Sequence, residues 1–219
     1  MLKCIGNIFS KLMTSRVELH ASETCPECGS QLAREAGDHA LKTAWQCPNP
    51  DCPPQVLKRV SLWASPEAMD IKGCDTGIVS QLVSRGLVRD AAEFYRLRLA
   101  EIAMLDSMDK QRAGELFDAI RASKSQAAWR VLFGLGIPNV GATESQALCR
   151  NFPTLDGLFA AGRERIARNG GVSEVVARSL ADWFADSVNR KLIKRLEKAG
   201  VNFRSELYQS QTVTSPVKN

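Results

Sequence analysis

Hydrophobic residues between positions 71 and 184 recur at the spacing of helix faces. Apolar residues three, four and seven positions apart form the buried side of an amphipathic helix, whereas a half-buried strand would show strict alternation. We therefore predict a mainly α-helical fold for this part of the chain. The residues that carry the pattern are Ile78, Val79, Leu82, Val83, Leu116, Ile120, Ala177, Leu180, Ala181 and Phe184.

The chain also repeats itself with a period of about 32 to 34 residues. The third column of the repeat holds turn formers and polar residues, the fourth is apolar, and the last is leucine in every copy. The fourth copy is the loosest, because it opens on a polar residue. The copies are residues 71–82 (IKGCDTGIVSQL), 105–116 (LDSMDKQRAGEL), 137–148 (IPNVGATESQAL) and 169–180 (NGGVSEVVARSL).

Each copy predicts a tight turn that leads into a helix. A turn former, a buried apolar residue and then a helix N-cap, with a leucine seven positions later, describe a helix–hairpin–helix unit. The predicted N-caps, in the fifth column, are Asp75, Asp109, Gly141 and Ser173. Units of this size cannot bury a face alone, so the four should pack on one another as one helical body. Packing for stability alone remains an alternative at this point.

A hairpin that leads into a helix can also bind an anion. Unpaired N–H groups and the positive end of the helix dipole suit a phosphate, and glycine lets a phosphodiester approach the backbone. The third and fourth hairpins meet this criterion, although Glu174 weakens the fourth. We expect their phosphate contacts at Gly136, Asn139, Val140, Gly141, Thr143, Gly170, Gly171 and Ser173.

The first and second hairpins are predicted to be mainly structural. Asp75 and Asp109 stand at the helix starts, where a carboxylate caps the N–H groups itself and repels phosphate. In the second hairpin, Lys110 and Arg112 are expected to compensate partly and to add contacts to an anion.

Four cysteines ahead of the repeat form two pairs, spaced C-x2-C and C-x4-C. Two such knuckles brought together by a short hairpin present four thiolates in the tetrahedral arrangement of a structural zinc site. Four protein ligands leave no open position for substrate, so we predict a structural Zn²⁺. His39 in the spacer is more simply a solvated residue than an alternative ligand. The predicted ligands are Cys25, Cys28, Cys47 and Cys52.

Composition narrows the cellular location and the kinds of partner that we expect. Seven cysteines, four of them bunched, do not suggest a secreted disulfide framework, so we expect a reducing, cytoplasmic location. No apolar run approaches the roughly 20 residues that a membrane span needs, and no membrane partner is expected. The formal charge of +5 permits an anionic partner, but the segment 189–204 accounts for the whole excess.

The order of the motifs resembles the C-terminal half of bacterial NAD-dependent DNA ligases, over about residues 23 to 204. The resemblance implies a structural zinc finger and a hairpin domain that grips the minor-groove backbone of DNA at a nick. Two departures stand out: the family usually has glycine where this chain has Asp75, Asp109 and Ser173, and the Lys-x-Asp-Gly nucleophile motif is missing. The motifs are TCPECGSQL, CPNPDCPPQ, SPEAMDIKG, LFGLGIPNVGATESQAL and ARSLADWFADSVNRKLIKRLEKAGVNF.

The sequence thus predicts a mainly α protein with a tandem helix–hairpin–helix domain behind a small Cys4 zinc ribbon. We assign residues 1–22 to an N-terminal extension, 23–60 to the ribbon, 61–204 to four hairpin units and 205–219 to a polar tail. The expected function is non-catalytic, sequence-independent binding of double-stranded or nicked DNA in repair or replication, without catalytic residues. One alternative is a subunit of a split ligase that seals nicks with a separately encoded catalytic half. A second is a protein-interaction scaffold.

Overall fold

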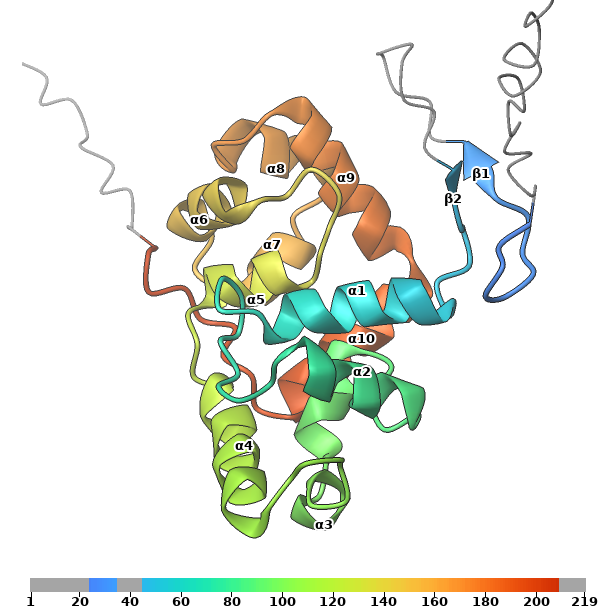
Figure 1. The fold of residues 1–219 in the computed structure, drawn as a ribbon. Helices are drawn as coiled ribbons and strands as arrows, with labels where there is room; N and C mark the ends of the chain where they lie inside the picture. Colours follow the sequence, from blue (N-terminus) through green and yellow to red (C-terminus); the bar gives the residue numbers. More distant parts are fainter. Residues whose placement is uncertain (1–23, 35–44, 209–219) are drawn as a thin grey trace, which may run out of the picture. The chain divides into compact units, whose positions relative to one another are not determined.

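The computed structural model describes residues 24–34 and 45–208. The predicted N-terminal extension, His39 and the end of the predicted tail lie outside these residues. The chain divides into two compact units, residues 1–48 and 49–219. In the first unit, β1 (Ala33–Arg34) pairs antiparallel with β2 (Trp45–Gln46), which is the short hairpin expected of a zinc ribbon (Figure 1).

The second unit is built from helices with short connections, and its described residues form no β-sheet, so the mainly α prediction is confirmed. Its first helix starts directly after Cys52, because Pro53 and Pro54 occupy helix positions that need no intrahelical N–H. The predicted boundary at residues 60 and 61 therefore falls inside this helix. The helices are α1 (Pro53–Ala64), α2 (Thr76–Ser84), η1 (Ala91–Arg96, a 3-10 helix), α3 (Leu99–Ile102), α4 (Lys110–Ser123), α5 (Ala128–Gly134), α6 (Ala142–Asn151), α7 (Leu155–Phe159), α8 (Arg163–Asn169), α9 (Glu174–Ala185) and α10 (Ser187–Lys198).

Residues in the same column of the repeat have the same backbone conformation in all four copies. All four third-column residues have positive φ: 77° at Gly73, 60° at Ser107, 62° at Asn139 and 65° at Gly171. This left-handed turn is what glycine and asparagine tolerate best. All four fifth-column residues are helix N-caps. The four last-column leucines are buried, and they are Leu82, Leu116, Leu148 and Leu180.

The hairpins pack in two pairs, the first hairpin (71–75) with the second (105–109) and the third (137–141) with the fourth (169–173). In the first pair, Arg85 Nη2 after α2 contacts Asp106 Oδ1 of the second hairpin at 2.6 Å. In the second pair, Asn151 Nδ2 on α6 donates to the carbonyl of Gly170 at 3.3 Å. Arg85 and Asn151 each lie three residues after the last leucine of their copy of the repeat. Their partners, Asp106 and Gly170, are each the second residue of their own copy. The two pairs are therefore versions of one arrangement.

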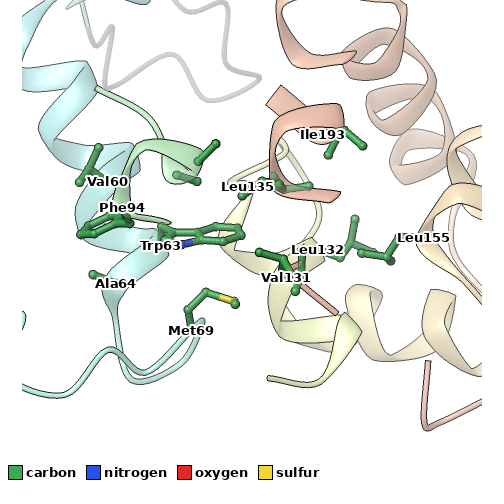
Figure 2. Close-up of a cluster of buried hydrophobic side chains, with 14 of the residues drawn as sticks. Val60, Trp63, Ala64, Met69, Phe94, Val131, Leu132, Leu135, Leu155 and Ile193 are labelled. Carbon is green, nitrogen blue, oxygen red and sulfur yellow. The ribbon is translucent and has the colours of Figure 1, made fainter. Parts of the chain in front are cut away.

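One core joins the two pairs. Trp63 on α1 is fully buried, and its ring points toward Val131 and Leu132 of α5 (Figure 2). Gly134 leaves room for this ring, because a Cβ at position 134 would lie 3.0 Å from Trp63 Cε3. Helices α3 and α4 lie at one end of the unit, and α6 and α8 lie at the other (Figure 1).

The segment after α10 crosses between the pairs. Asn202 donates its backbone N–H to Lys124 O, 2.8 Å away, just past α4 of the first pair. The next residue, Phe203, accepts from the N–H of Leu155 at 2.9 Å, at the start of α7 in the second pair. Ser205 Oγ then donates to Cys149 O on α6. The end of the described chain thus fixes the two hairpin pairs to each other.

Candidate metal centre and nucleic-acid interface

Four cysteine sulfur atoms converge as the sequence spacing predicts. The thiols of Cys25, Cys28, Cys47 and Cys52 all lie within 4.8 Å of one another. A tetrahedral zinc ion with Zn–S bonds of about 2.3 Å needs its sulfur atoms about 3.8 Å apart, so the donor set and its dimensions fit such an ion.

The backbone around the first knuckle is organised for a metal. Gly29 N–H donates to Cys25 O at 2.8 Å, and Cys25 N–H donates to Ser30 O at 2.7 Å. The turn needs φ of +70° at Gly29, which favours glycine. Cys25 and Cys52 are buried, whereas Cys28 and Cys47 are partly buried. The cluster therefore has the donor atoms, the turn and the burial that a structural metal ion needs.

Two other described cysteines are unsuited to metal binding. Burial, with a smaller contribution from the negative charge of nearby Asp75, raises the pKa of the Cys74 thiol to about 12. Burial likewise raises the pKa of Cys149 to about 12. Both thiols stay protonated at neutral pH, and they pack with the helical core as the sequence predicts.

The third hairpin is the most open of the four at its helix start. In the other three units the fifth-column side chain accepts a hydrogen bond from the N–H three residues on, as Asp75 does from Ile78. Gly141 has no side chain to do this, so the Glu144 N–H has no such cap among the described residues. Gly136, Asn139 and Thr143 are exposed around this turn, whereas the Val140 side chain is buried and its N–H closes the turn on Ile137 O.

The contact of the Glu144 carboxylate with the third hairpin was not predicted from the sequence. Glu144 Oε2 accepts from the Gly141 N–H at 3.0 Å, so this N–H already has an anionic partner. A glutamate three residues after an N-cap is the signal that could have revealed this contact. The N–H groups left for an external phosphate are those of the first turn of α6 rather than that of Gly141.

The fourth hairpin is less open than predicted from the sequence. Ser173 Oγ accepts from the Val176 N–H at 3.4 Å and caps α9. Glu174, expected to repel phosphate, is paired with Arg163 across the turn, with Arg163 Nε at 2.6 Å. This ion pair offsets the carboxylate charge next to the helix start.

Gly170 has a packing role. A Cβ at this position would lie 2.4 Å from Ile166 O and 3.1 Å from Leu148 Cδ2.

Gly170→Ala is therefore expected to lower the free energy of unfolding by about 1–3 kcal/mol, the usual cost of overpacking a core. Urea denaturation measures this loss. Gly162→Ala is an unsuitable control because φ is +24° there, whereas Gly114→Ala on α4, which meets nothing within 4 Å, should not destabilise. Equal stability of Gly170→Ala and the native chain would contradict the packing role.

The predicted cations of the second hairpin lie apart from the third and fourth. Lys110 and Arg112 are exposed at the start of α4. Arg112 Nη1 donates to Ser107 O at 2.9 Å within its own hairpin, and Asp109 caps the Arg112 N–H at 2.8 Å. The Arg112 side chain is thus already used to close the turn, and the structure brings neither cation to the second pair.

The basic segment at α10 is partly structural. Arg190 donates to Phe184 O and Ala185 O at the end of α9, and Arg195 pairs with Asp90 at the start of η1. Lys191, Lys194 and Lys198 stay exposed. Part of the charge excess therefore joins α10 to its neighbours instead of facing solvent freely.

Comparison with known proteins matches both parts of the site. Residues 24–53 match the NAD-dependent DNA ligase C4 zinc finger domain, and residues 130–193 match a helix-hairpin-helix motif. The chain resembles the C-terminal part of bacterial NAD-dependent DNA ligases. The resemblance drawn from the sequence motifs is thereby confirmed.

The relatives that match this ligase-like chain include DNA ligases of three bacteria. A DNA ligase of Methylacidiphilum infernorum is 37% identical over 90% of this chain and 28% of its own length. DNA ligases of Synechococcus sp. and Rubrobacter xylanophilus are 39% and 37% identical over 81% and 85% of the chain. The chain spans about a quarter of the length of these relatives. Among the described residues, no helix has the length and apolarity to cross a membrane.

Proposed function

We propose that the ligase-like chain is a DNA-binding module that holds the duplex backbone without reading its sequence. The observation that carries the proposal is the start of α6, the one described hairpin helix whose fifth-column residue leaves the N–H groups of the first turn uncapped. Helix N-termini of this kind bind phosphate through N–H groups and the helix dipole. Contacts of this type position a duplex and carry no sequence information.

The pairing of the third and fourth hairpins fixes the geometry of the proposed phosphate contacts. Asn139 Nδ2 of the third hairpin donates to Ser179 Oγ on α9 at 2.9 Å, and Asn151 on α6 holds the carbonyl of Gly170 in the fourth hairpin. Each hairpin is thus fixed to the helix of the other. Such a pair presents two turns at a constant separation, which suits two phosphates of one duplex.

Replacing Gly141 tests the role of the third hairpin. Gly141→Asp is expected to weaken duplex binding by about tenfold or more, because hydrogen bonds to charged groups contribute about 1.5–3 kcal/mol and an aspartate here would cap the first turn as Asp75 and Asp109 do. The backbone at Gly141 is extended, with φ of −84°. A Cβ there would lie 2.8 Å from Glu144 Oε2, the end of a flexible side chain that can move aside, so the variant should fold. Titration of nicked duplex by fluorescence anisotropy measures the change.

The reciprocal substitution is the control for this test. Asp109→Gly at the same column of the second unit costs only a few tenths of a kcal/mol in helix capping and should not weaken DNA binding. Unchanged affinity in Gly141→Asp would show that the third hairpin does not contact DNA. No salt-dependent binding by the native chain would remove the DNA proposal and leave the interaction scaffold.

We further propose that the metal of the cysteine cluster is a structural Zn²⁺. Cys25, Cys28, Cys47 and Cys52 would hold it, and a closed Cys4 shell leaves no position for water or substrate. When bound, the ion supplies stability to a segment that has only a two-stranded hairpin of its own. The proposed DNA contacts are made by the helix–hairpin–helix units and not by this metal-binding segment.

A second candidate function follows from the share of the relatives that the chain matches. Because the chain spans about a quarter of the length of these DNA ligases, we propose as the alternative that it serves a ligase catalytic half encoded separately. Mixing the chain with such a half and a nicked duplex tests this. Sealing that depends on the chain supports the split-ligase function, and sealing that is the same without the chain argues against it.

A further inference from the structure

An open hollow of about 760 Å³ lies beside the fourth hairpin. Its walls come from the connection between α7 and α8, from α8 itself and from Glu174, the residue directly after the Ser173 cap. Arg163, Arg165 and Arg168 line it, and we call these three the α8 arginines. The hollow therefore begins where the fourth hairpin ends, and its lining carries cationic side chains.

The α8 arginines differ in how far they are neutralised. Arg163 is committed to Glu174 through its Nε and Nη2 atoms. Arg168 approaches Glu164 only to 3.7 Å, with both side chains at least 75% exposed, and such surface pairs contribute little. Arg165 has no ion pair with any residue that the structure describes, and its guanidinium lies 5.9 Å from the Phe152 ring centroid. Arg165 and Arg168 can therefore bind an external anion.

The first hairpin pair provides an internal comparison. Ile102 on α3 and Ile166 on α8 are both buried and stand at the same place before their hairpins. The match extends upstream, where Asp90 and Thr154 cap η1 and α7. The residues of the first pair that correspond to Arg163, Arg165 and Arg168 are Leu99, Glu101 and Met104.

The fold does not require arginine at these three positions. Leu99 is 45% exposed and Met104 75% exposed, so the common architecture accepts apolar residues at these positions and does not require arginine. Arginine at these three positions occurs only in the second pair, the one that contains the uncapped third hairpin. Both hairpins of that pair lie within residues 130–193, which match the helix-hairpin-helix motif.

We propose that Arg165 and Arg168 bind phosphates of the duplex that runs past the fourth hairpin, so that the second hairpin pair is the DNA-engaging half of the body. Arginine suits this role, since its planar guanidinium donates two hydrogen bonds to one phosphate. The proposal rests on the DNA-binding function and extends it with side-chain contacts and an asymmetry between the pairs. The first pair contributes no phosphate contact.

The salt dependence of duplex binding tests the proposal. In the double variant Arg165→Gln/Arg168→Gln, the slope of log K against log[salt] should become shallower by about 1.8, because each neutralised phosphate contributes about 0.9. If the native chain and the double variant bind equally at 1 M salt, the same relation gives an affinity about 60-fold lower for the variant at 0.1 M salt. Both side chains are exposed, and an unchanged circular dichroism melt verifies that the variant is folded.

The matched control removes a cation from the first pair. Arg96, exposed at the end of η1, corresponds to Ala160 of the hollow, and Arg96→Ala should leave the slope and the affinity unchanged. An equal loss in Arg96→Ala, or an unchanged slope in the double variant, overturns the proposal. If the native chain binds DNA and Gly141→Asp weakens binding while the double variant does not, only the α8 arginines are misassigned. Absence of binding by the native chain instead removes the DNA-binding function itself.

Discussion

Loss of the metal is expected to unfold the four-cysteine segment and to leave the helices intact. Structural zinc sites of this type contribute about 10–16 kcal/mol of apparent folding free energy, which two strands of two residues each cannot replace. The helical core starts at Val56 and includes none of the four cysteines. In Cys47→Ser we therefore expect loss of bound zinc and fast amide exchange over residues 24–34, with unchanged helical circular dichroism.

The control for this experiment is a cysteine outside the cluster. Cys74→Ala should keep one zinc per chain, because Cys74 packs against the helical core. Elemental analysis of the purified protein measures the metal directly. Retention of one tightly bound zinc in Cys47→Ser would show that a different set of ligands holds the metal.

Trp63→Ala is expected to lower the free energy of unfolding of the helical unit by about 3–5 kcal/mol, the range for aromatic truncation in a core. Trp63 is fully buried between α1 and α5, and its ring also meets Tyr95 edge-on at 6.4 Å between centroids. A small side chain would leave a cavity that the surrounding helices can close only in part. Urea denaturation followed by circular dichroism measures the loss.

The third hairpin unit supplies a matched control for Trp63. Trp129 stands at the same place before its hairpin as Trp63 does before the first, but it is only partly buried, and the guanidinium of Arg130 lies over its ring. Trp129→Ala should cost clearly less than Trp63→Ala. Equal losses would mean that burial against α5 does not account for the stability of this region.

The local structure of the hairpins could be predicted because it depends on neighbouring residues. A residue with positive φ, an N-cap and a buried leucine must follow one another at fixed spacing, so the repeat columns are visible in sequence. The four cysteines were predictable for the same reason, since metal coordination restricts their spacing. The start of α1 was less visible, because an apolar pattern does not show that Pro53 begins the helix.

Contacts between distant residues were not predictable in this way. Arg163 offsets Glu174 only because α8 and α9 lie side by side, and nothing in the spacing of the two residues indicates an ion pair. The same applies to Asn151 and Gly170, whose hydrogen bond joins the hairpins into a pair. Openness of a hairpin to phosphate depends on such contacts, which is why the fourth hairpin is more closed than its glycines suggest.

The crossing segment after α10 has a consequence for how the protein folds. Asn202 and Phe203 complete hydrogen bonds with Lys124 and Leu155, residues that lie far earlier in the chain. Contacts of long sequence separation form late, because a large loop must close before they contribute. On the ribosome the hairpin pairs and the core between α1 and α5 can form as they emerge, but the hydrogen bonds of the crossing segment to both pairs form only after residue 203 has been synthesised.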